Sequence, residues 1–207
     1  MRGLSVLGVR ETQKLATRRR VLDAASDLFN EIGFEDATVR AIANRAGVSV
    51  GSVFTTFTSK ADILSQVMQD RLEALYEETG RVIPLMRGSV ADRCRSLFAV
   101  LYAFEMRRVK LFLAHIAVAY RWEMEPAARP FGANQAFRGL LTTWLQDGAA
   151  RGDVRTDVDS EAVIDLLLGV YAWNYRLAAA ENAESDRLTA IMDKQIGMIF
   201  DGLRPRV

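Results

Sequence analysis

The chain has 207 residues, half of them hydrophobic, and a formal net charge of only +1. This is enough apolar material for one mid-sized domain or for a small and a larger one. The single cysteine, Cys94, excludes an intramolecular disulfide and fits a reducing compartment. The strongly apolar runs at 111–120 and 166–175 are too short for the roughly 20 residues that span a bilayer. We therefore expect a cytoplasmic protein without a membrane segment.

The charges are unevenly distributed along the chain. The first 20 residues carry six Lys or Arg side chains against one acidic residue, Glu11. A basic N-terminal end on an otherwise balanced chain indicates contact with a polyanion. We expect residues 1–16 to form a flexible basic arm.

Helical punctuation continues along the whole chain. Apolar residues recur at a spacing of three to four, and polar caps and glycines mark the ends. This pattern predicts helices at about 17–32, 39–46, 49–57, 61–80, 89–106, 109–122, 131–150, 160–180 and 185–200. No stretch shows the two-residue alternation of a strand, so the predicted fold is all-α.

The segment AIANRAGVSVGSVFTTFTSK, residues 41–60, has the pattern of a helix, a tight turn and a second helix. Thr38 can cap the first helix, Gly47 can supply a left-handed turn residue, and Ser49 can cap the second helix. In the second helix Val53 and Phe57 are four residues apart and face inwards. Ser52, Thr55 and Thr56 share the outer face. On this pattern alone, a small amphipathic core helix with a polar surface is the favoured interpretation.

The longer segment TRRRVLDAASDLFNEIGFEDATVRAIANRAGVSVGSVFTTFTSKADIL, residues 17–64, resembles the N-terminal domain of the TetR family of transcriptional regulators. The resemblance rests on the R-x-x-x-L-D-A-A-x-x-L-F, I-A-x-x-A-G-V-S and G-x-x-F-x-x-F runs. It implies a three-helix DNA-binding domain with a helix-turn-helix at 17–60. It also implies a larger helical domain for effector binding and dimerisation at 61–207. Two positions depart from the family. Its members often have Lys at the position of Val50, and they usually have a phosphate-binding Tyr at the position of Phe54.

The second helix of the motif has no Lys or Arg, although phosphate neutralisation dominates DNA affinity. Phosphate contacts and base readout can be divided between different residues, with basic groups elsewhere holding the backbone. Hydroxyls and methyl groups of the second helix can then read base edges. The expected DNA-binding residues are Arg18, Arg19, Thr38, Arg40, Ser49, Val50, Gly51, Ser52, Phe54, Thr55, Thr56 and Lys60.

Aromatic residues are dense between Phe98 and Tyr175. For any single one, core packing is the simpler interpretation. As a group, with polar residues among them, they favour a mostly apolar effector pocket, which the resemblance also implies. The expected pocket residues are Tyr102, Glu105, His115, Trp144, Trp173 and Asn174.

The last two long helices have apolar faces that could pack within the protomer or form a self-complementary dimer surface. The family resemblance implies a four-helix bundle with a symmetry mate. The expected interface residues are Gly169, Ala172, Ile191, Gln195, Ile196 and Ile199.

The leading functional hypothesis is a homodimeric repressor that a small hydrophobic effector releases from an inverted-repeat operator in double-stranded DNA. Two alternatives are a helical enzyme and a DNA-binding protein without an effector, and activation in place of repression stays open. The enzyme alternative is disfavoured because one His, one Cys and no clustered ligands leave few catalytic groups. We therefore expect no catalytic residue, no metal and no cofactor.

Overall fold

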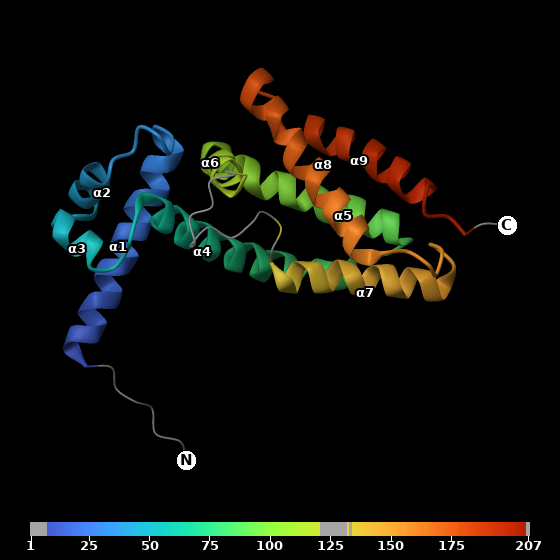
Figure 1. The fold of residues 1–207 in the computed structure, drawn as a ribbon, viewed down its shortest axis with the longest axis horizontal. Coiled ribbons are helices and arrows are strands. Elements are labelled where there is room, and N and C mark those ends of the chain that lie inside the picture. Colours follow the sequence, from blue (N-terminus) through green and yellow to red (C-terminus); the bar gives the residue numbers. More distant parts are fainter. Residues whose placement is uncertain (1–7, 121–131, 133, 206–207) are drawn as a thin grey trace, which may run out of the picture. The chain divides into compact units, whose positions relative to one another are not determined.

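The computed structural model describes residues 8–120, 132 and 134–205. Within these residues all regular elements are helical, which confirms the predicted all-α fold (Figure 1). The elements are α1 (Val9–Glu31), α2 (Val39–Ala46), α3 (Val50–Phe54), α4 (Lys60–Gly80), the 3-10 turn η1 (Ile83–Leu85), α5 (Val90–Glu105), the 3-10 turn η2 (Met106–Arg108), α6 (Val109–Ala119), α7 (Gln135–Arg151), α8 (Ser160–Glu181) and α9 (Ser185–Asp201).

The first helix differs from its predicted bounds. α1 begins at Val9, eight residues before the predicted start at residue 17, so residues 9–16 of the expected flexible arm are helical. Residues 11–16 are exposed along this extension. The run from 9 to 16 consists mostly of residues with good helix propensity, and it continues the helix without a side-chain cap.

The chain divides into two compact units. The first contains the described parts of Met1–Leu72 and Lys110–Ala128, and the second those of Glu73–Val109 and Arg129–Val207. The division falls within α4, about one-half of the way along it, and not at the expected boundary between residues 60 and 61. The first half of α4 thus belongs with the helix-turn-helix in packing terms.

The first unit builds its core where α1 packs on α2 and α2 on α3 (Figure 1). Phe29, Ile42, Val53 and Phe57 are fully or almost fully buried. Gly33 takes φ = +89° just after α1, and the ring of Phe34 then packs 5.3 Å from that of Phe29. This contact is the hydrophobic closure expected after a helix ending in glycine.

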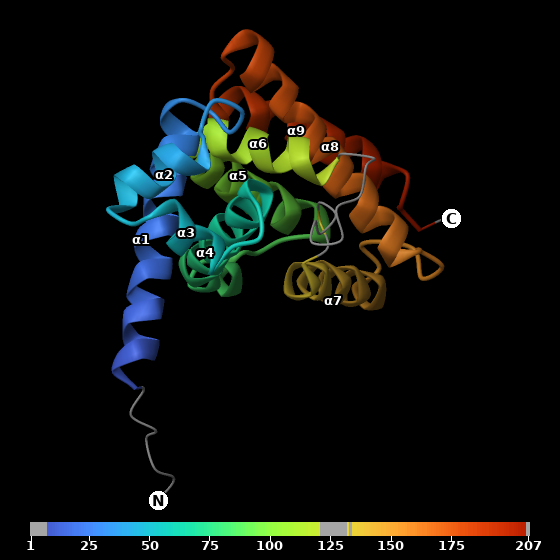
Figure 2. The same ribbon diagram turned by 60° about the vertical axis from the view of Figure 1, so that its left-hand side comes forward.

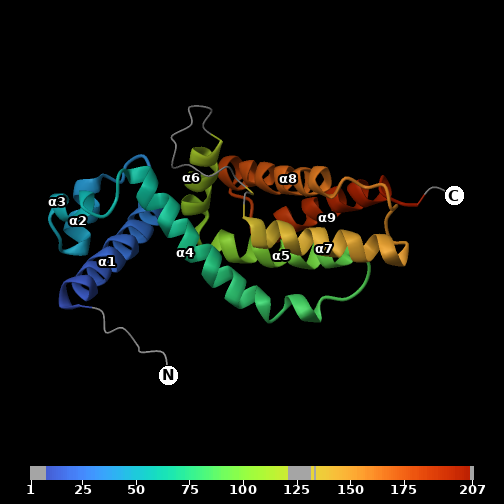
Figure 3. The ribbon, with the colours of Figure 1, turned by 60° about the horizontal axis from the view of Figure 1, so that its bottom comes forward.

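The second unit is a bundle in which α5 packs on α7 and α9, and α8 on α7 and α9 (Figure 3). Figure 2 shows α8 and α9 running side by side. The rings of Tyr102, Tyr171 and Tyr175 pack against one another in the core in tilted and edge-to-face arrangements, with ring centroids 4.8 to 5.4 Å apart. Tyr171 and Tyr175 share a hydroxyl–hydroxyl hydrogen bond of 3.0 Å, so their polar atoms are satisfied.

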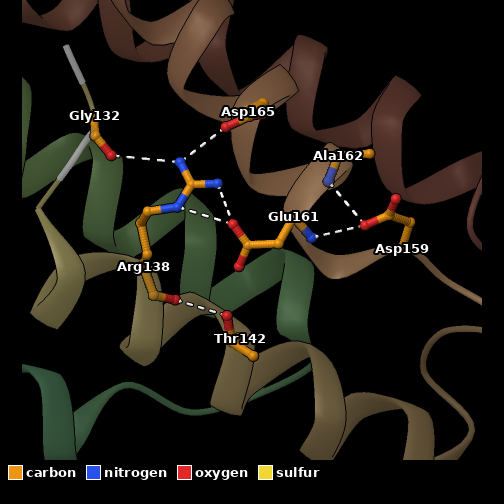
Figure 4. Close-up of polar contacts among 7 residues, drawn as sticks. All are labelled: Gly132, Arg138, Thr142, Asp159, Glu161, Ala162 and Asp165. Atoms are coloured by element: carbon orange, nitrogen blue, oxygen red, sulfur yellow. Dashed lines mark hydrogen bonds and ion pairs between the residues drawn. The ribbon is translucent and has the colours of Figure 1, made fainter. Parts of the chain in front are cut away.

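A group of ion pairs fixes α7 to the start of α8 (Figure 4). The Arg138 guanidinium, only 16% exposed, bonds Glu161 through Nε and Nη2 and donates from Nη1 to Asp165 at 2.8 Å. It also donates to the carbonyl of Gly132 at 3.4 Å. The Asp159 carboxylate caps α8 by accepting hydrogen bonds from the backbone amides of Glu161 and Ala162. The sequence patterns had not indicated this group, because its members lie on different elements.

None of the helices in the described part of the chain is both long and apolar enough to cross a membrane.

Candidate nucleic-acid interface

The helix-turn-helix forms as its caps predict. The Thr38 hydroxyl accepts from the Ala41 amide at 3.1 Å at the start of α2. Gly47 ends α2 in the left-handed conformation, with φ = +65°, where a side chain would be strained. The Ser49 hydroxyl accepts from the Ser52 amide at 3.0 Å and starts α3. The two helices are therefore held at a defined turn by local bonds.

The outer face of α3 mixes hydroxyls with exposed apolar groups. Thr55 is exposed, Ser52 and Thr56 are half-buried, and Val50 and Phe54 have exposed fractions of 38% and 54%. Val50 and Phe54 are four residues apart, so the two exposed apolar side chains are neighbours on the helix surface. Gly51 is also exposed, and a Cβ there would meet only the Ser49 hydroxyl at 3.8 Å, so the glycine leaves open space on this face.

The basic residues expected to hold phosphates differ in availability. Arg40 on α2 is exposed, and no bond or ion pair of its side chain is found among the described residues. Arg19 is 68% exposed and pairs with Asp23 and Asp70, contacts that are weak in water and can be exchanged for a phosphate. These two residues remain predicted phosphate contacts.

Arg18 and Lys60 serve inside the first unit instead. The Arg18 guanidinium donates to the Gln66 side chain and lies 5.1 Å from the Phe57 ring. The Lys60 ammonium donates to the carbonyls of Phe34 at 2.6 Å and Glu35 at 3.1 Å, committing two of its three donors. Its predicted phosphate contact finds little support in this placement, because Lys60 closes the loop between α1 and α2.

One ion pair in this unit was not predicted. Arg45 on α2 makes two hydrogen bonds, of 3.1 and 2.9 Å, to the Glu31 carboxylate at the end of α1. The hydrogen bond from Arg45 lowers the pKa of Glu31 from its usual value. Arg45 is thereby occupied within the first unit.

Among the expected effector residues, Tyr102 and Asn174 lie together in the core of the second unit. The Asn174 amide donates to the Tyr102 hydroxyl at 3.1 Å and to the Gln195 carbonyl oxygen at 2.7 Å. The Tyr102 hydroxyl donates to the Tyr171 backbone carbonyl at 3.2 Å. Glu105 is also buried. The pKa of Tyr171 is raised, mainly because the residue is buried and further because of neighbouring groups that include Glu105. These residues form a polar centre inside the bundle.

The remaining three expected effector residues are separated. Trp144 is buried in the second unit, with the Arg93 guanidinium 5.1 Å from its ring. His115 belongs to the first unit, where burial lowers its pKa to about 4. Trp173 is 63% exposed on α8, so its assignment to an internal pocket is wrong for this protomer. Its helix turns it away from Asn174, the next residue, which is fully buried.

The expected interface residues also divide. Gly169 is exposed, and Ile191, Gln195 and Ile199 are half-buried. Ala172 and Ile196 are buried within the protomer, so these two are core residues. The exposed apolar side chains that the sequence analysis missed on α8 and α9 are Leu166 and Met198, exposed by 51% and 68%.

No group of three or more His, Cys, Asp or Glu residues in the described ranges could hold a metal ion. The capped helices α2 and α3, with an exposed face that mixes polar and apolar groups, form a helix-turn-helix of the kind that binds nucleic acid. Residues 21–67 match the family described as bacterial regulatory proteins, tetR family. This match runs from the second half of α1 through the helix-turn-helix into the start of α4.

Two curated relatives are named as an HTH-type transcriptional regulator and an HTH-type transcriptional repressor. The chain is 37% identical over 81 residues to the HTH-type transcriptional regulator BetI of Klebsiella pneumoniae (strain 342), which covers 39% of this chain and 42% of BetI, so it spans less than half of that relative. It is 24% identical over 152 residues to the HTH-type transcriptional repressor KstR2 of Mycolicibacterium smegmatis, covering 73% of this chain and 74% of KstR2. These relatives are regulators and not enzymes.

The fold of solved structures extends the similarity over nearly the whole chain. Thermus thermophilus FadR, a TetR family transcriptional repressor in complex with lauroyl-CoA, superposes with a TM-score of 0.70 at 25% identity. The superposition covers 92% of this chain and 96% of FadR.

Proposed function

We propose that this protein is a DNA-binding transcriptional repressor. The observation that carries the proposal is the exposed face of α3, held behind a capped α2 and the left-handed Gly47. A helix presented in this way can enter the major groove, while exposed arginines such as Arg19 and Arg40 bind phosphates. The naming of KstR2 and of Thermus FadR as repressors supports repression over activation.

The effector we propose is a long-chain acyl-CoA. The support is the lauroyl-CoA complex of the Thermus protein, whose fold matches this chain over nine-tenths of its length. An acyl chain needs an apolar, aromatic lining, and the second unit supplies aromatic side chains around Tyr102 and Phe98.

The functional form we propose is a homodimer on an inverted repeat. Leu166, Gly169 and Trp173 are exposed and three to four residues apart, so they form an apolar stripe along the outer face of α8. Such a stripe suits contact with the same stripe of a second copy. Two reading helices related by a two-fold axis would then meet half-sites one helical turn or a multiple apart.

The test measures binding of the full chain to the DNA upstream of its own coding region, by fluorescence anisotropy. We expect saturable binding to one inverted repeat and release on addition of lauroyl-CoA, with free coenzyme A and laurate as controls. Coupling between ligand and DNA is reciprocal, so the operator must weaken lauroyl-CoA binding by the same factor in calorimetry. Equal lauroyl-CoA affinity with and without operator would exclude release by this ligand, and no preference for any repeat would exclude the repressor.

A further inference from the structure

On the outer face of α3, most of the hydroxyl groups already donate their hydrogens to other atoms of the same segment. α3 ends at Phe54, so the Ser52 carbonyl lies in its last turn, where backbone amides no longer reach every acceptor. The Thr56 amide bonds the Val53 carbonyl at 2.9 Å instead. The Ser52 carbonyl accepts from the Thr55 hydroxyl at 2.7 Å and from the Thr56 hydroxyl at 3.5 Å.

A hydroxyl has one hydrogen and two lone pairs. Once Thr55 and Thr56 donate to the Ser52 carbonyl, the groups they offer outwards are acceptors. The Ser49 and Ser52 hydroxyls lie 2.8 Å apart, and their mutual bond uses one of their two hydrogens. Of the four hydroxyl hydrogens on this face, three are therefore engaged within the helix and its cap.

The remaining groups on this face are apolar. Val50 and Phe54 are exposed, and the segment Val50–Phe54 has no Lys, Arg, Asn or Gln. Guanine presents two acceptors in the major groove, N7 and O6, which require donors from the protein. Adenine presents an amino group as a donor at N6, and thymine presents a methyl group. Acceptors and apolar groups therefore match an A·T pair, and this face offers the two acceptors of guanine at most one hydroxyl hydrogen.

We propose that α3 selects A·T base pairs, with threonine hydroxyl oxygens accepting from adenine N6 amino groups and with Phe54 and Val50 packing on thymine methyl groups. Cytosine also offers an amino donor, but its partner guanine would keep at least one of its two acceptors unsatisfied against α3. This inference rests on the proposed DNA-binding function and adds the base pairs that α3 recognises.

The experiment selects bound duplexes from a random library with the full chain and repeats the selection with two variants. Phe54→Ala removes the exposed ring, and Thr55→Val removes the hydroxyl while keeping the branched shape. Positions whose base preference changes in either variant are the α3-dependent positions. We expect A·T pairs at these positions. Replacing thymine by uracil there should weaken binding about fourfold per methyl contact, and Phe54→Ala should remove this difference.

Thr143→Val is the matched control. The Thr143 hydroxyl donates to the Gly139 carbonyl at 2.9 Å on α7, the same kind of bond outside the helix-turn-helix. Its loss should leave the selected sequence unchanged, while Thr55→Val should reduce the preference for adenine at one position about tenfold.

Two results would overturn the inference in distinguishable ways. G·C pairs at the α3-dependent positions, with no effect of uracil, would refute A·T readout while leaving the repressor function standing. Selection of no sequence above the random pool, with binding that depends on salt alone, would refute the proposed function itself.

Discussion

His115 is the chain's one histidine, and burial lowers the pKa of its imidazole from about 6.5 to about 4. The folded protein keeps the ring neutral in this interval, whereas the unfolded chain takes up a proton below about 6.5. Since the unfolded state binds more protons, stability should fall as the pH is lowered from about 6.5 towards 4. Between pH 6.5 and 5.5 no carboxylate of ordinary pKa titrates, so this histidine dominates the change.

The measurement is the free energy of unfolding in urea at pH 6.5 and 5.5, for the parent and for His115→Phe. We expect the parent to lose up to about 1.4 kcal/mol per pH unit, and the variant to lose almost nothing. A parent whose stability is flat over this window would show that the imidazole titrates normally in the folded state.

Residues of the helix-turn-helix could be predicted individually, because their roles are set by neighbours three or four positions away. Thr38, Gly47 and Ser49 are of this kind. The contacts of Lys60 could not be predicted, because its partners, the carbonyls of Phe34 and Glu35, lie about 25 positions earlier and no local pattern points to them. A lysine at a helix start looks the same in sequence whether it meets a phosphate or a loop.

The helix pair α5–α7 depends on one close approach. A Cβ added at Gly148 on α7 would lie 2.1 Å from Cγ2 of Val90 on α5, closer than real contacts allow. Gly148→Ala should therefore force the helices apart and destabilise the fold by about 1 to 3 kcal/mol in urea denaturation. Removing the opposing methyls in a Val90→Ala, Gly148→Ala double variant should restore part of this loss, beyond the sum of the single effects.

Gly139 on the same helix supplies the control, because a Cβ there would meet nothing within 4 Å. Gly139→Ala should stabilise the protein by roughly 0.5 to 1 kcal/mol, through the helix propensity of alanine alone. A Gly148→Ala variant that gains stability as Gly139→Ala does would contradict the close packing of α5 on α7.

Most helix bounds followed from end signals, as α2, α5 and α8 illustrate. The start of α5 is closed by Ser89 and Asp92 in a reciprocal capping box. The start of α1 could not be found in this way, since Gly8 precedes it without a side-chain cap. There the threonine at 17 suggested a boundary, but the favourable helix propensity of the preceding residues continues the helix.

At the scale of the whole molecule, the proposed homodimer can be tested through the stripe on α8. Leu166→Glu would place a carboxylate in the proposed contact, where an unpaired buried charge costs several kcal/mol. We expect sedimentation to find the parent as a dimer at micromolar concentration and the variant as a monomer. Operator binding should weaken in parallel, because one reading helix then meets one half-site.

Leu85→Glu is the matched control, because Leu85 is 68% exposed and lies in η1, outside α8 and α9. This variant should remain a dimer. The substitution avoids buried positions such as Ile196, where a charge would disrupt the protomer core and obscure the result. A Leu166→Glu protein that sediments as a dimer would place the contact elsewhere.

The division into units shows what sequence alone leaves open. Polar contacts within the second unit, such as Asn174 with Tyr102, join α8 and α5, which are distant in the chain, and the sequence of neither helix identifies the other as its partner. The sequence pattern predicted that the C-terminal helices carry apolar faces. Which residues of α8 turn inwards was fixed only by packing, as the adjacent Trp173 and Asn174 illustrate.

Trp144 and Trp173, two of the chain's three tryptophans, are fluorophores in different surroundings. Trp144 is 5% exposed, and Trp173 is 63% exposed with the Arg176 guanidinium 4.7 Å from its ring. An indole shielded from water emits at shorter wavelength than one in contact with it, and only the latter is readily quenched by added iodide. With Trp122 replaced by Phe, intrinsic emission can therefore separate loosening of the bundle, which would expose Trp144, from the covering of α8, which would protect Trp173. One fluorescence measurement would then report on both folding and assembly without an attached dye.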